Sequence, residues 1–211
     1  MKTKLSVLLA ALLLFPALTR AQSDAGAWSD IMAVKGFECG AYGMARVEHR
    51  SYNNMADTEC WFAMAGGGYN FTKWLKADVS YEYWQIMQTV TTHKAVLCAN
   101  ATMRSGDWAF AAREKYELAY NAGSDSFSHT LRTRFRVQYS TAGEVIRYTP
   151  YVMMEVFNGL GSSATPWVRN LHYAGCEFGL GAHHSVDLFY MFHLHNSGSA
   201  HILGIGYTFI F

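Results

Sequence analysis

The chain has 211 residues and a formal net charge of +1, with 51% hydrophobic and 16% charged residues, whereas about 25% are charged in a typical globular domain. It is too apolar to be disordered, and it lacks the strongly basic character that a nucleic-acid-binding protein needs. Its 13 Phe, 13 Tyr, 6 Trp and 18 Gly, with 3 Pro, favour β-strands joined by tight turns and argue against a coiled coil.

Residues 1–21 have the features of a secretory signal peptide. Lys2 and Lys4 precede an apolar run that extends from Leu5 to Leu18, and small side chains before a cut after Ala21 suit a signal peptidase. A signal anchor is the alternative, but the run is shorter than the roughly 20 residues of a membrane-spanning helix. We therefore expect an exported chain whose mature part begins at residue 22.

After residue 21, polar and apolar residues alternate with a period of two along most of the chain. The segment HTLRTRFRVQYS places Arg132, Arg134 and Arg136 on one face and Phe135 and Val137 on the other. A strand separates residues in this way, whereas a helix would scatter the arginines around its surface. No apolar run in this part is long enough to cross a membrane as a helix.

The alternation predicts an all-β fold of about ten antiparallel strands, with eight or twelve as alternatives. Residues 22–35 are expected to form a lead-in or an extended first strand, and residues 36–211 a barrel. Short and longer links alternate along the chain, which predicts that both of its ends lie on the periplasmic side of a bacterial barrel. The strands are expected near residues 36–50, 58–70, 73–88, 91–104, 107–122, 126–140, 144–157, 167–182, 185–195 and 200–211.

A soluble sheet and a transmembrane barrel both accommodate such strands, and the aromatic residues favour the barrel. Apolar faces repeatedly begin or end with Trp or Tyr, as at Trp61, Trp108, Tyr139 and Tyr148. This placement is typical of the aromatic belts at the two interfaces of an outer-membrane barrel. We therefore expect a monomer in the outer membrane of a Gram-negative bacterium, in contact with its lipid.

The last strand ends in HILGIGYTFIF, where Tyr207, Phe209 and Phe211 share one face. This ending resembles the C-terminal signal by which bacterial outer-membrane barrels reach their assembly machinery, so that machinery is an expected partner. Gly204 and Gly206 lie on the opposite, lumenal face, where a missing side chain leaves room for a bulky neighbour.

Several short motifs together resemble an uncharacterised outer-membrane family, domain of unknown function 2490 (DUF2490). They are WSDIMAVKGF, VEHR, THKAV, RTRFR, YVMMEVFNG and GIGYTFIF. The resemblance implies a small barrel, and it supplies no activity, ligand or catalytic residue. Where the family often has His-Arg, this chain has His93 and Lys94, and a lysine does not replace the bidentate contacts of an arginine.

Charged side chains on the lumenal faces are the candidate functional residues. Acids and bases are nearly balanced there, and a barrel of about ten strands has a modest interior. We therefore expect a paired charge network that largely fills the lumen and permits limited solute or anion binding, with no catalytic residue, metal or cofactor assigned. The network is expected to include Arg46, Glu48, Arg50, Glu82, Arg113, Arg132, Arg134, Arg136, Arg147 and Glu155.

Two other hypotheses concern His193, His195 and the residues near them. With Asp187 on the same predicted face, these histidines suit either a metal site or a polar rim. A lipid-modifying hydrolase of the outer membrane is the alternative function, and it would need a nucleophile, a base and an acid together. Ser197 or Ser199 with His195 or His201 is the conceivable set.

The four cysteines, Cys39, Cys60, Cys98 and Cys176, contain no CxxC pair, which argues against a structural zinc site. An oxidising compartment permits disulfides, and four cysteines allow three pairings. Cys39, Cys98 and Cys176 are expected at lipid-facing or wall positions.

Overall fold

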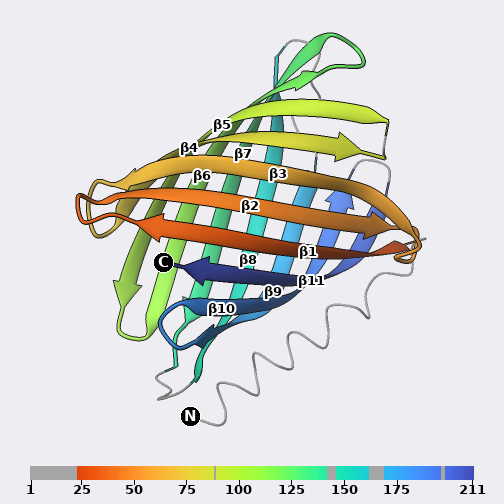
Figure 1. Ribbon diagram of the computed structural model, residues 1–211. Helices are drawn as coiled ribbons and strands as arrows, with labels where there is room; N and C mark the ends of the chain where they lie inside the picture. Colours follow the sequence, from red (N-terminus) through yellow and green to blue (C-terminus); the bar gives the residue numbers. More distant parts are fainter. Residues whose placement is uncertain (1–22, 88, 142–145, 162–168, 196–197) are drawn as a thin grey trace.

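The computed structural model describes residues 23–87, 89–141, 146–161, 169–195 and 198–211. Within these ranges eleven strands form one closed barrel (Figure 1). The described residues contain no helix that is long and apolar enough to span a membrane. The predicted signal peptide at residues 1–21 lies outside the described part.

The strands are 12 to 16 residues long, and each follows the alternation seen in the sequence. They are β1 (Ser23–Gly36), β2 (Ala41–Tyr52), β3 (Asp57–Asn70), β4 (Leu75–Ile86), β5 (Val90–Ser105), β6 (Trp108–Asn121), β7 (Ser126–Tyr139), β8 (Ile146–Leu160), β9 (Arg169–Leu180), β10 (His184–His195) and β11 (Gly198–Ile210).

The all-β barrel is confirmed, with one strand more than the expected ten. Consecutive strands pair antiparallel, and β1 closes the ring by pairing parallel with β11 from Ser23–Ser199 to Val34–Ile210. Antiparallel order around a whole ring requires an even number of strands, so an odd ring contains one parallel pair. The additional strand is β1, in the segment for which the sequence left a lead-in and a strand open.

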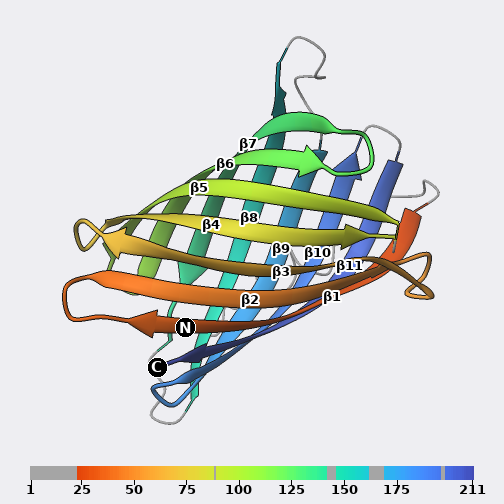
Figure 2. The same cartoon turned by 45° about the horizontal axis from the view of Figure 1, so that its top comes forward.

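The expectation that both ends of the chain lie on one side was wrong for the described residues. Because β1 runs parallel to β11, Ser23 lies at the barrel end away from Phe211 (Figures 1 and 2). We call the end with Phe211 the C-terminal end and the end with Ser23 the opposite end. Asp24 fixes β1 at the opposite end, since its carboxylate accepts backbone N–H bonds from Asn53 and Asn54 at 2.9 Å.

The barrel has charged side chains inside and apolar side chains outside. Glu48, Glu82 and Glu155 are at most 3% exposed. The outward positions of the same sheet carry large apolar residues that are more than half exposed, among them Ile31, Val47, Leu97, Met103, Phe135 and Leu203. A soluble sheet would bury its apolar face, so the distribution is the reverse of that alternative.

Glycines beside the parallel pair admit a bulky side chain, as the sequence predicted for residues 204 and 206. The Phe189 ring of β10 lies over Gly204, and a Cβ at that position would overlap the ring. A Cβ at Gly206 would lie 2.9 Å from a carboxylate oxygen of Asp30. Both close approaches are confirmed, and they allow β1, β10 and β11 to pack tightly from the inside.

We expect Gly204→Ala to lower the free energy of unfolding by about 1–3 kcal/mol, because the Phe189 ring must move out of a packed position. Urea titration of the refolded barrel would measure the change. Gly43→Ala is the matched control, since a Cβ there meets nothing within 4 Å. Equal losses in the two variants would contradict the packing role of Gly204.

Candidate functional site

A cavity of about 780 Å³ occupies the part of the lumen toward the C-terminal end. At that end Val34, Gly36 and Ile210 line it, and deeper in the barrel Trp28 and Trp84 do so. Eight of the ten residues predicted for the charge network contribute to its wall, and the remaining two are Glu155 and Arg147.

Glu155 is the centre of the ion pairs on this wall. Its side chain is fully buried, and its carboxylate accepts hydrogen bonds from Arg113 at 2.6 Å, Arg132 at 3.0 Å and Arg134 at 2.7 Å. The sheet register explains the arrangement, because Arg113, Arg134 and Glu155 are direct partners across β6, β7 and β8. Arg132 lies two residues from Arg134 on the same face of β7.

From Arg132 the ion pairs continue along the inner wall, through β6, to β5 and β4. Arg132 contacts Glu117 at 2.5 Å, and Glu117 also pairs with Lys94 at 3.4 Å and Lys115 at 2.9 Å. Lys115 in turn reaches Glu82 at 2.9 Å.

We call these eight residues the central network. It consists of Glu82, Lys94, Arg113, Lys115, Glu117, Arg132, Arg134 and Glu155. Five cations share three carboxylates, so the central network has a formal charge of +2.

A smaller group accounts for two more of the predicted arginines, Arg46 and Arg50. Arg46 pairs with Asp30 at 3.1 Å and with Glu48 at 2.5 Å, and Glu48 also accepts from Arg50 at 2.5 Å. The sequence analysis did not include Asp30 in the charge network, because its segment was left open between a lead-in and a strand. The alternation of Trp28, Asp30 and Met32 with outward residues is the signal that places Asp30 in the lumen.

Arg136 and Arg147 lie outside the central network. Arg136 pairs with Glu177 at 3.4 Å, and its guanidinium stacks 3.9 Å from the Tyr151 ring. Arg147 is exposed at the start of β8 and has no ion pair among the described residues.

Some of the arginine donors at the cavity have no partner. Arg113 and Arg136 each have a buried Nε without a hydrogen bond in the part of the chain that is described. The side chains of Arg113, Arg134 and Arg136 are 21–25% exposed, so they are partly available to the cavity. Arginine presents several donors in a fixed plane, which suits carboxylates and phosphates.

Aromatic and apolar side chains fill the lumen at the deep end of the cavity and beyond it. The Arg50 guanidinium lies 3.7 Å from the Trp28 ring, and Phe157 has Arg132 and Arg169 each at 4.1 Å. Phe157, Leu171 and Met191 are at most 2% exposed and belong to one buried cluster.

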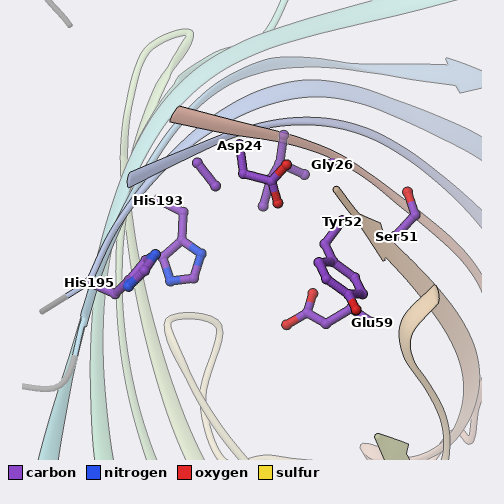
Figure 3. Close-up of a pocket in the computed structure, with 9 residues that line it drawn as sticks. Asp24, Gly26, Ser51, Tyr52, Glu59, His193 and His195 are labelled. Atoms are coloured by element: carbon purple, nitrogen blue, oxygen red, sulfur yellow. The ribbon is translucent and has the colours of Figure 1, made fainter. Parts of the chain in front are cut away.

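A second cavity, of about 140 Å³, lies at the opposite end and shares no lining residue with the first (Figure 3). His193 and His195 point into it from β10, with Tyr52 and Glu59 across the space. Asp187, by contrast, lines the large cavity and accepts a hydrogen bond from the Tyr151 hydroxyl at 2.9 Å. The three residues share the inward face of β10 as predicted, but Asp187 lies six positions before His193 and lines the other cavity, so they do not form one site.

The described residues contain no cluster of three or more metal-ligating side chains. They also give no support to the hydrolase hypothesis. His201, one of the two histidines in that hypothesis, lies on the outer face. Its Nδ1 is already in contact with the Tyr190 hydroxyl at 2.5 Å. Ser197 lies outside the described residues.

All four cysteines are free thiols. Cys39 is exposed in the turn between β1 and β2, and Cys176 is half-buried. Cys98 faces the lumen and lines the large cavity, so its expected lipid-facing or wall position is corrected to an inward one.

The chain is similar to one protein family and to a solved structure. A family model described as "Protein of unknown function (DUF2490)" matches residues 25–201. Among curated proteins, none matches the chain. A solved structure titled "NanC porin structure in rhombohedral crystal form" is similar with 10% sequence identity and a TM-score of 0.49, over 80% of this chain and 85% of that chain.

Proposed function

The chain belongs to the DUF2490 family, which is described as of unknown function, and we propose that it is a bacterial outer-membrane barrel whose lumen binds small anions. The observation that carries the proposal is the central network, in which five cations share three carboxylates and four of the cations, Arg113, Lys115, Arg132 and Arg134, line a large cavity.

Two belts of aromatic residues on the outer face support the membrane location. At the opposite end, ring contacts link Trp61, Tyr83, His93, Tyr120 and Phe127 in sequence, with centroids 5.1–6.3 Å apart. At the C-terminal end the paired rings are Tyr69–Phe71, Trp108–Tyr139, Tyr148–Phe178 and Phe209–Phe211.

The spacing of the belts also agrees with a bilayer. On β6, Trp108 belongs to one belt and Tyr120 to the other. At about 3.3 Å per residue and a strand tilt of about 40°, they lie roughly 30 Å apart along the membrane normal, close to the height of a barrel's apolar band.

The charge of the central network favours an anion as the ligand. A net positive wall inside a cavity with apolar surroundings attracts anions more strongly than the same charge in water. Arg134 and Arg136 offer partly exposed guanidinium groups, and Arg136 has an unpartnered Nε. Because Phe157, Leu171 and Met191 fill the lumen beyond, the proposal is a binding cavity and not a wide pore.

Anion binding is testable through tryptophan fluorescence, since Trp28 and Trp84 line the cavity. We expect saturable titration by citrate or phosphate at low ionic strength, which weakens as salt is added. The double variant Arg134→Gln, Arg136→Gln should weaken binding by roughly tenfold or more, because charge-assisted hydrogen bonds are lost.

The Arg134→Gln, Arg136→Gln variant also loses positive charge, and this loss can weaken anion binding without any specific contact. Lys73→Gln is the control for this effect, because Lys73 is exposed in the β3–β4 turn at the C-terminal end, away from the central network. It should leave the titration unchanged. Saturable binding that is the same in both variants would overturn the proposed site, and an absence of any saturable anion response would overturn the function.

We further propose that the chain is a monomer in contact with lipid and that its C-terminal strand engages the barrel assembly machinery. In support, Phe211 is 58% exposed and its ring packs 4.6 Å from that of Phe209 on the outer face. Tyr207 lies on the same face, where its hydroxyl contacts His184 at 2.6 Å.

A further inference from the structure

The outer face repeats one side-chain pair in three hairpins that close at the opposite end. In each, a tyrosine five residues before the end of the first strand contacts a histidine three residues after the start of the next. The Tyr hydroxyl lies 2.5–2.7 Å from the histidine Nδ1 in all three. The pairs are Tyr81–His93 in β4–β5, Tyr116–His129 in β6–β7 and Tyr190–His201 in β10–β11.

The sheet register makes the three pairs equivalent. Tyr81 pairs directly with Ala95, Tyr116 with Leu131 and Tyr190 with Leu203, so each histidine lies diagonally from its tyrosine. Diagonal neighbours on one face of a sheet are within reach of aromatic side chains.

The hydrogen bond determines which imidazole nitrogen remains available. When the phenol O–H donates to Nδ1, a neutral imidazole has its proton on Nε2. With that tautomer, the Tyr hydroxyl positions an N–H donor on the outer face. Next to a bilayer, such a donor needs an acceptor, because leaving a polar group unpaired in an apolar environment is unfavourable.

The position of these donors selects the acceptor. His93 is part of the aromatic belt at the opposite end, with Tyr83 and Tyr120 rings 5.5 Å and 6.3 Å away. Aromatic belts lie at the level of lipid headgroups. The acceptors concentrated at that level are the anionic phosphate oxygens of the lipids.

We propose that the two exposed pairs, Tyr81–His93 and Tyr116–His129, are lipid-headgroup sites, in which the imidazole Nε2–H donates to the phosphate of a membrane lipid. The Tyr190–His201 pair is partly buried and is not included. The inference rests on the proposed membrane location and is independent of the lumenal anion site. The histidines are the binding residues, and the tyrosines are positioning residues that fix the imidazole.

The chain contains a matched control for these sites in the β8–β9 hairpin. His172 also lies three residues after the start of its strand, at the same register, but Val152 stands where the other hairpins have tyrosine. It is an outer-face histidine at the same end without a phenol partner among the described residues.

The test counts phospholipids retained by the barrel in native mass spectrometry from dodecyl maltoside micelles to which phosphatidylglycerol is added. We expect His93→Phe and His129→Phe each to remove one tightly retained lipid and the double variant to remove two, with apparent affinity roughly tenfold lower at each altered site. His172→Phe should change nothing. Heat-modifiable migration on gels checks that each variant is folded.

Further measurements distinguish the possible causes of lipid retention. A galactolipid without phosphate should not be retained, and millimolar inorganic phosphate should not displace phosphatidylglycerol. Arg134→Gln should leave retention unchanged, so failure of this proposal and failure of the lumenal anion site give different results. Equal retention of the two lipids, displacement by free phosphate, or loss of retention in Arg134→Gln would each overturn the proposal.

A second measurement tests whether the tyrosine hydroxyls fix the imidazole rings. It also keeps the proposal testable if the histidine variants do not fold. Tyr81→Phe and Tyr116→Phe keep the aromatic ring and remove only the hydroxyl. We expect weaker lipid retention, together with imidazole ¹⁵N shifts that lose the signature of a protonated Nε2 and a hydrogen-bonded Nδ1. Unchanged shifts and unchanged retention in both variants would overturn the role of the pairs.

Discussion

Replacing Glu155 by alanine should lower the free energy of unfolding of the barrel by about 3–5 kcal/mol. Its carboxylate is fully buried and is shared by Arg113, Arg132 and Arg134. Removing one member of a buried ion pair leaves charge without compensation in a place with little water, and here three guanidinium groups are affected at once. Arg132 retains Glu117, whereas Arg113 and Arg134 have no second carboxylate among the described residues.

Urea titration of the refolded barrel in lipid vesicles is the measurement for Glu155→Ala. Glu38→Ala provides the control, because it removes the same group from an exposed turn between β1 and β2; changes at such positions are usually within about 0.5 kcal/mol. If both variants were equally stable, the arginines would not depend on Glu155.

Replacing Phe135 by arginine should destabilise the barrel by about 2–4 kcal/mol, as expected for a charge near the middle of the lipid-facing band. Phe135 is 54% exposed on the outer face of β7. On the same strand Phe127 and Tyr139 belong to the two aromatic belts, which places Phe135 within roughly 5 Å of the midpoint.

Phe127→Arg is the matched control, since this residue has the same chemistry and is 65% exposed but lies in the belt at the opposite end. An arginine at interface depth should cost about 0–1 kcal/mol. The same urea titration in lipid vesicles would compare the two. Equal costs at both depths would exclude a lipid environment around β7 and would contradict the membrane location.

The sequence predicted the faces of the strands because alternation is a local property. Arg132, Arg134 and Arg136 could be assigned to the lumen from β7 alone, and the structure has all three there. Their partners could not be assigned, because a pair such as Arg113–Glu155 joins residues 42 positions apart. Such a pairing depends on the register of three strands and on the curvature of the closed sheet.

Two other features could not be predicted from single strands: the pairing of β1 with β11, and the repeated Tyr–His pairs. The pairing of β1 with β11 could not be predicted from the alternation in β1, because it requires knowledge of where the barrel closes. The Tyr–His pairs left a usable signal, since they are separated by 12, 13 and 11 residues in their hairpins. Recognising that repeat requires strand ends accurate to one residue, which an alternation pattern does not give.

Because β1 and β11 are parallel, the first and last described residues lie at different ends of the barrel. A chain that runs the length of a barrel an odd number of times finishes at the end away from its start. Ser23 and Phe211 therefore lie at opposite ends of the barrel. In a membrane, the two ends would therefore meet different compartments, and a label before Ser23 would not share its surroundings with one after Phe211. In the proposed membrane location, the strand that completes the ring would thus also be the one that carries the beginning of the barrel across the bilayer.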